Sequence, residues 1–147
     1  MLPALTEHGF LPVPPTVHVV PLDDLPGCFG AKPWRKQLWI SFMDFVRWLK
    51  TNTAVSEIYL DGRFLTASDD VAHVEVGIEL TVELIRKSGF DVFKIPALDE
   101  YSVRVRYFAP FRPALYNFHE EFQTPDPEIR LREAPADLRK GYIQIRL

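Results

Sequence analysis

The residues whose types and spacing best suggest chemistry are His73 and Glu75. They lie in residues 71–80, where apolar and polar side chains alternate. Such alternation is typical of a β-strand with one apolar face, so we expect both side chains to point to the same side. A pair of carboxylates at these positions can bind Mg²⁺, which bridges phosphate oxygens and activates an attacking oxygen. Only Glu75 is a carboxylate here.

A turn precedes this pair. The short apolar strand predicted over residues 57–60 is closed by Asp61-Gly62, and Arg63 follows. A glycine after a strand is commonly only a turn residue, and an alternating strand commonly turns its polar side to solvent. Arg63 has two interpretations, a solvated turn residue or a cation placed to bind a phosphate. The residues alone leave these alternatives open.

Helices and strands of mixed order surround these positions, which indicates an α/β fold. The clearest helix begins at Pro33 and ends at Thr51-Asn52-Thr53, with an apolar stripe that starts at Trp34. On this pattern Arg35 lies on a polar face, and Trp39 falls outside the stripe and could mark an interface. The other predicted elements are strands at 71–80, 101–108 and 142–147, helices at 81–87 and 115–122, and an uncertain strand at 91–95.

Length and composition describe one globular domain spanning residues 1–147. The chain has 147 residues, 47% of them hydrophobic, 25% charged, and a single cysteine, which excludes disulfide scaffolds and cysteine-rich zinc sites. Thirteen prolines gather toward both ends and predict wrapping termini, with residues 1–32 as an extended arm. No apolar run is long enough for a membrane span and no signal peptide is evident, so we expect a cytoplasmic protein.

Seven short motifs, spread along nearly the whole chain, resemble those of a known family in their order and spacing. They are Gly9-Phe10-Leu11-Pro12, Leu22-Asp23-Asp24-Leu25, Phe29-Gly30, Gly62-Arg63-Phe64-Leu65-Thr66, Tyr101-Ser102-Val103-Arg104-Val105, Ala114-Leu115-Tyr116-Asn117-Phe118 and Lys140-Gly141-Tyr142-Ile143. Together they resemble a small, largely uncharacterised bacterial and phage family of nucleotidyltransferase-like proteins, a domain of unknown function. The resemblance implies a minimal nucleotidyltransferase-like fold, a mixed sheet flanked by helices.

The same resemblance implies where a catalytic site would lie. In nucleotidyltransferases a Gly-Ser turn holds the triphosphate, two carboxylates one residue apart lie on the next strand, and a third carboxylate lies on a neighbouring strand. In this chain the turn glycine falls on Gly62 and its serine on Arg63. The first carboxylate falls on His73, the second remains as Glu75, and the third falls on Arg104. Three of these positions have therefore changed chemistry.

These departures predict that a side chain has replaced the metal. Mg²⁺ prefers oxygen ligands, and Arg104 stays charged at any working pH. If its strand lies beside that of Glu75, its guanidinium can pair with the carboxylate where the metal would have been. An alternative alignment makes Asp91 the third carboxylate, with Glu75 and Asp91 holding Mg²⁺.

We therefore expect a catalytically degenerate nucleotidyltransferase-like protein without a cofactor and without a confident catalytic residue. It would bind either a partner protein or the phosphate of a nucleotide or RNA, the latter through Arg104, Arg106 and the phosphate-binding pair Gly62 and Arg63. One alternative is an active Mg²⁺-dependent nucleotidyltransferase with Arg63 on the phosphates. The other is a purely structural interaction module of phage or defence origin.

Overall fold

The structure is a computed structural model that describes residues 18–20, 22, 33–61, 64, 71–89, 101–108 and 142–147. In order, the described elements are β1 (His18–Val20), α2 (Pro33–Asn52), β2 (Glu57–Asp61), β3 (Val74–Glu79), α3 (Val82–Ser88), β4 (Val103–Phe108) and β5 (Ile143–Arg146). The α/β class is confirmed. The expectations for residues 91–95 and 115–122, and most of those for the termini, lie outside the described residues.

The strands form one mixed sheet with the order β1-β5-β2-β3-β4. Strand β2 runs antiparallel to both β3 and β5, whereas β3 and β4 are parallel, as are β1 and β5. Parallel neighbours need a long crossover connection, and α3 lies in the connection between β3 and β4. The mixed sheet with associated helices agrees with the sequence prediction.

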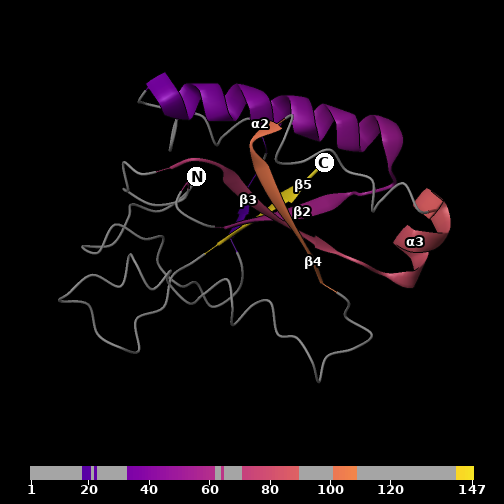
Figure 1. The fold of residues 1–147 in the computed structure, drawn as a ribbon. Helices are drawn as coiled ribbons and strands as arrows, with labels where there is room; N and C mark the ends of the chain where they lie inside the picture. The colour runs from indigo at the N-terminus through magenta and orange to yellow at the C-terminus, as the bar shows by residue number, and fades with distance from the viewer. Residues whose placement is uncertain are drawn as a thin grey trace, which may run out of the picture.

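Helix α2 lies across one face of the sheet (Figure 1). Its predicted bounds are correct, because it starts at Pro33 and ends at Asn52. Proline suits the first helical position, where its missing N–H is not needed. At the other end, the side chains of Thr51, Asn52 and Thr53 donate hydrogen bonds of 2.8–2.9 Å to the carbonyls of Arg47, Trp48 and Leu49. Side chains that bond to backbone carbonyls in this way compete with the helical hydrogen bonds, which suits them to a helix end.

The main core lies between α2 and the sheet. From α2 it takes Phe42, Phe45, Val46 and Leu49, and from the strands it takes Ile58, Leu60, Val74, Val76, Ile78, Val103, Ile143 and Ile145. On β2, β3 and β5 these are alternate residues, which places them on one face of the sheet, and the register pairs Val103 of β4 with Val74 on that same face. Each such side chain contributes about 1.5–3 kcal/mol by burial.

Three predictions for the start of α2 are wrong, those for Trp34, Arg35 and Trp39. Trp34 is 41% exposed, whereas Arg35 is 5% exposed, so the buried stripe begins at Arg35. Trp39 belongs to that stripe, with its ring centroid 5.4 Å from that of Phe42 and 6.5 Å from that of Phe64. The spacing from Arg35 to Trp39 to Phe42 is four and then three residues, which keeps all three on one side of a helix.

The opposite face of the sheet is polar. By register it carries Glu57, Tyr59 and Asp61 from β2, Glu75 and Glu79 from β3, Arg104 and Arg106 from β4, and Gln144 and Arg146 from β5. We call it the polar face. A small apolar cluster of Tyr59, Phe108 and Tyr142 interrupts it.

Candidate functional site

A row of three charged residues crosses the polar face at one end. Strand register places Asp61 of β2 opposite Glu75 of β3, and Glu75 opposite Arg104 of β4. Residues paired across strands point to the same face, so the side chains of all three are neighbours. The predicted juxtaposition of Glu75 and Arg104 is therefore present.

One carboxylate oxygen, Glu75 Oε1, is the centre of this arrangement. The guanidinium of Arg106 donates through Nη2 at 3.4 Å, Arg104 Nη1 lies at 3.8 Å, and His73 Nε2 lies at 3.7 Å. We call these four residues the Glu75 cluster. Sequence reasoning named Arg106 as a phosphate-binding cation but paired Glu75 only with Arg104, although alternation along residues 101–108 already places both arginines on one face.

Arg104 is loosely held. Charge-assisted N–H···O⁻ bonds are usually about 2.7–2.9 Å long, whereas both guanidinium distances to Glu75 are longer. The Arg104 side chain is 53% exposed, compared with 28% for Arg106 and 16% for Glu75. Within the described part of the chain, the Arg104 guanidinium makes no hydrogen bond and one ion pair. Its donors are therefore available to an anion.

Asp61 is a functional candidate that sequence reasoning placed in a turn. The residue is 5% exposed, ends β2 and lies directly opposite Glu75. Two carboxylates directly opposite each other repel, and the guanidinium groups of Arg104 and Arg106 offset the charge of Glu75. The sequence pattern that could have predicted this position is the two-residue period of a strand. Counted from Glu57 through Tyr59, it places Asp61 on the polar face.

The donor set of the cluster does not suit Mg²⁺. This ion requires near-octahedral oxygen coordination, and no group of three or more His, Cys, Asp or Glu residues among the described residues could hold a metal ion. Glu75 Oε1 already has two permanent cations within 4 Å. A divalent ion at this oxygen would have to displace both guanidinium groups.

The structure thus brings together His73, Glu75 and Arg104 of the residues predicted from the sequence. Gly62 and Arg63, predicted to bind phosphate, and Asp91, the alternative metal ligand, lie outside the described residues. Their predicted roles stay predictions.

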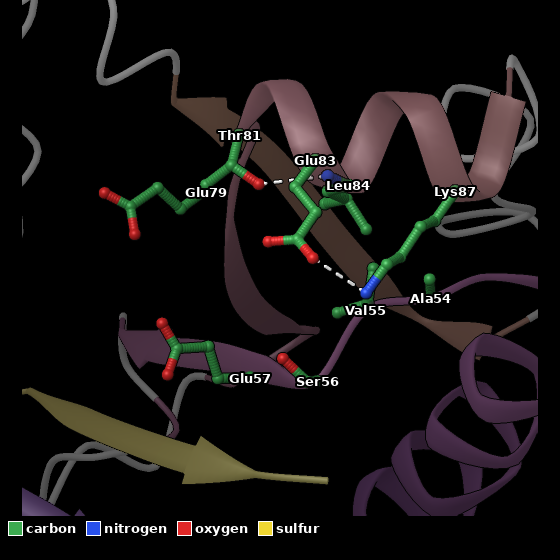
Figure 2. A pocket seen from close by; sticks show the side chains of 9 residues that line it. All are labelled: Ala54, Val55, Ser56, Glu57, Glu79, Thr81, Glu83, Leu84 and Lys87. Carbon is green, nitrogen blue, oxygen red and sulfur yellow. Dashed lines mark hydrogen bonds and ion pairs between the residues drawn. The ribbon is translucent and has the colours of Figure 1, made fainter.

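A pocket of about 310 Å³ lies at the other end of β2 and β3, beside α3 (Figure 2). Its lining residues are Ala54, Val55, Ser56, Glu57, Glu79, Thr81, Glu83, Leu84 and Lys87. Three of them are glutamates, and the single lysine forms a 2.8 Å ion pair with Glu83. A pocket with this charge repels phosphate, so it does not compete with the Glu75 cluster as a phosphate site.

The glutamates of this pocket also act on a neighbouring tyrosine. Burial, the charges of Glu57 and Glu79, and a hydrogen bond to Glu57 raise the pKa of Tyr59 to about 12. Glu57 also accepts a 2.7 Å hydrogen bond from Gln144 Nε2. The two ends of the polar face therefore differ, one carrying paired arginines and the other carrying glutamates.

Comparison with known proteins assigns the chain to a family. A family model matches residues 3–146, nearly the full chain. The chain belongs to this family of unknown function (DUF6932). No curated protein and no solved structure matched it. Membership confirms the predicted domain of unknown function, while the likeness to nucleotidyltransferases and the bacterial or phage origin stay predictions.

Neither described helix is long and apolar enough to cross a membrane. Helix α2 has 20 residues, but charged and polar side chains recur along its outer side.

Proposed function

We propose that this chain is a catalytically degenerate nucleotidyltransferase-like protein that binds the phosphate of a nucleotide or RNA at the Glu75 cluster, in the cytoplasm. The observation that carries the proposal is the position of Arg104. Its guanidinium is half-exposed, makes no hydrogen bond within the described residues, and lies beside a second arginine on the same face. Two adjacent guanidinium groups can bind phosphate oxygens with paired N–H donors.

The cluster binds phosphate without a metal ion. In a metal-dependent transferase, carboxylates hold Mg²⁺, and the ion neutralises the phosphate. Here the cations are part of the protein, and Glu75 holds them at the surface of the sheet. The guanidinium groups can neutralise phosphate, but they cannot lower the pKa of an attacking hydroxyl by coordination. Binding without nucleotidyl transfer is the expected result.

Phosphate binding has better support than capture of a partner protein. A half-exposed arginine such as Arg104, with a long ion pair and a second arginine beside it, can bind anions, whereas the polar face shows no described apolar patch beyond the mostly buried cluster around Tyr59. Arg63, predicted from the resemblance to meet phosphate, is included in this proposal as a third cation.

The first experiment measures binding of ATP and of a single-stranded RNA oligonucleotide, in excess EDTA and in Mg²⁺. We expect binding in both conditions, weakened about tenfold by Arg104→Ala and also weakened by Arg63→Ala. Arg86→Ala removes an exposed arginine of α3 and should leave the affinity unchanged. The ATP and RNA arms distinguish the two sources of phosphate.

Radiolabelled nucleoside triphosphates provide the second readout. The proposal predicts no transfer of label to RNA or protein in Mg²⁺ or Mn²⁺. Metal-dependent transfer would establish the active enzyme instead. Failure to bind ATP and RNA would favour a module that binds other proteins.

A further inference from the structure

We infer that the Glu75 cluster binds a terminal phosphate, a phosphate monoester at the end of a nucleotide or of an RNA strand, and not the phosphodiester backbone of RNA. The inference rests on the function proposed above and names the class of phosphate that the same site takes. It also assigns His73, beside the two arginines, as a phosphate-binding residue.

The nitrogen donors of the cluster converge on one point. Arg104 Nη1, Arg106 Nη2 and His73 Nε2 lie 3.8, 3.4 and 3.7 Å from Glu75 Oε1. Strand register places Arg104 opposite Glu75 and Arg106 opposite Gly77. Because Gly77 has no side chain, Arg106 meets none directly across β3, and its guanidinium lies beside Glu75 instead. Donors that surround one point suit a compact anion better than an extended one.

A phosphate monoester matches these donors in number. It carries a charge of about −1.5 to −2 at neutral pH and three acceptor oxygens, whereas a diester carries a single negative charge and two free oxygens. Within the described residues, the side chains of Arg104 and His73 make no hydrogen bond, and they are 53% and 33% exposed. His73 donates when Nε2 carries a proton. With Arg106, the cluster therefore offers one donor group for each oxygen of a monoester.

Glu75 makes the cluster selective for the charge of its ligand. Its carboxylate lies within 4 Å of both guanidinium groups, so an incoming phosphate competes with it for the same donors. Coulombic attraction is proportional to charge, so a monoester is attracted up to about twice as strongly as a diester at the same distance. A diester carries no more charge than the carboxylate that it would have to displace. The carboxylate therefore disfavours the diester.

The charges around the cluster also disfavour a long phosphodiester chain. On β2, Asp61 lies opposite Glu75. Along β3, the next charged side chain is Glu79, roughly 13 Å away at the spacing of a strand, and it lines the acidic pocket together with Glu57 (Figure 2). Arg146 of β5 lies opposite Glu57 and adds one cation there. Proteins that follow a nucleic-acid backbone use a continuous positively charged groove, which the described strands do not have.

The test compares ligands that differ only in a terminal phosphate. Isothermal titration calorimetry in excess EDTA measures the affinity for RNA oligonucleotides of one sequence with a 5′-phosphate, a 3′-phosphate or hydroxyl groups at both ends, and for AMP and adenosine. We expect AMP and at least one end-phosphorylated oligonucleotide to bind about tenfold more tightly than their hydroxyl counterparts. A longer oligonucleotide with the same end should bind no more tightly. The AMP and RNA arms distinguish the two sources of a terminal phosphate.

Variants connect this preference to the cluster. Arg104→Ala and His73→Ala should each reduce the preference for the phosphorylated ligand several-fold. Both side chains are partly exposed and lie outside the main core, so melting temperatures near that of the wild type should confirm folding. Arg146→Ala is the matched control, because it removes an exposed arginine from the same face at the end that carries Glu57. It should leave the preference unchanged.

Three results would overturn the inference and leave the proposed binding of phosphate in place. They are equal affinity for phosphorylated and hydroxyl ligands, an affinity that rises with the length of the oligonucleotide, and a preference that is unchanged in Arg104→Ala or lost equally in Arg146→Ala. Failure of AMP, ATP and every RNA to bind would instead contradict the proposed function itself.

Discussion

At the scale of single residues, neighbours decide what Glu75 can do. Taken alone, a carboxylate on an alternating strand suits a magnesium site. In the folded chain one of its oxygens lies within 4 Å of Arg104, Arg106 and His73. The carboxylate therefore serves as the counter-ion for cations supplied by the next strand, and its removal should have the opposite effect to the removal of a metal ligand.

We predict that Glu75→Gln tightens ATP binding several-fold at low salt. The amide keeps the shape of the side chain but removes the negative charge that competes with phosphate for the guanidinium groups, and the gain should shrink as salt screens it. Titration of ATP in EDTA at two ionic strengths measures this effect. Glu79→Gln, on the same strand and face but opposite Phe108, should change the affinity much less. A metal site would instead lose binding in Glu75→Gln.

A second residue-scale prediction concerns Tyr59, whose pKa is raised from 10.0 to about 12. The native state keeps this proton at a pH where the unfolded state loses it, so the stabilisation is complete below pH 10 and is lost as the pH rises to about 12. Tyr59→Phe should therefore lose less stability over this interval. Urea unfolding at several alkaline pH values measures the slope.

Tyr107, whose pKa burial also raises, remains in the Tyr59→Phe variant and leaves part of the alkaline loss. Parallel pH profiles for the wild type and Tyr59→Phe would contradict the role assigned to Tyr59.

At the scale of elements, β4 begins with an unfavourable backbone conformation next to the candidate site. Ser102 has a φ of 52°, and its carbonyl accepts a 3.0 Å hydrogen bond from the Val74 N–H at the start of β3. The left-handed region costs an L-residue about 1–2 kcal/mol. The hydrogen bonds between the parallel strands β3 and β4 offset this cost at the start of β4, the strand that carries Arg104.

We predict that Ser102→Gly stabilises the protein by about 1 kcal/mol, because glycine adopts positive φ without that cost. Ser56→Gly is the control, since Ser56 has an ordinary φ, and it should destabilise by about 0.4–1 kcal/mol through the entropy of the unfolded chain. Urea denaturation measures both. A destabilised Ser102→Gly would show that the serine side chain contributes more than its backbone costs.

Helix α2 shows how far an element can be predicted. Its bounds follow from local chemistry, with proline at the start and Thr51, Asn52 and Thr53 at the end. Its buried side begins at Arg35, which periodicity based on apolar residues alone could not find. The buried Arg35 guanidinium donates a hydrogen bond to the Phe64 carbonyl, 29 residues away, and a buried contact at that separation does not follow from local sequence.

At the scale of the whole molecule, the residues that stabilise the fold and those proposed to bind phosphate lie on opposite faces of the sheet. One face holds the main core under α2, and the other holds the charged residues. Substitutions at the Glu75 cluster should therefore alter binding while leaving the core intact. A ligand that binds only the native state raises its stability by mass action.

We predict that ATP raises the melting temperature by the same amount in excess EDTA and in Mg²⁺, because protein cations supply the charge. Differential scanning fluorimetry measures the shift, which should be smaller in Arg104→Ala. At a concentration of 100 times Kd the stabilisation is about 2.7 kcal/mol. A shift that requires Mg²⁺ would support metal-dependent binding.

The sequence by itself determined the α/β class, the bounds of α2, the existence of α3 and β4 to within two residues at each end, and the shared face of His73 and Glu75, because capping residues and hydrophobic periods act within a few residues. Only the tertiary structure decided the rest. The register of β2, β3 and β4 brought Asp61 and Arg106 to Glu75, and the packing of α2 buried Arg35 against Phe64. Those contacts join residues about 14 to 31 positions apart, where charge and hydrogen bonding across elements, rather than local pattern, choose the partner.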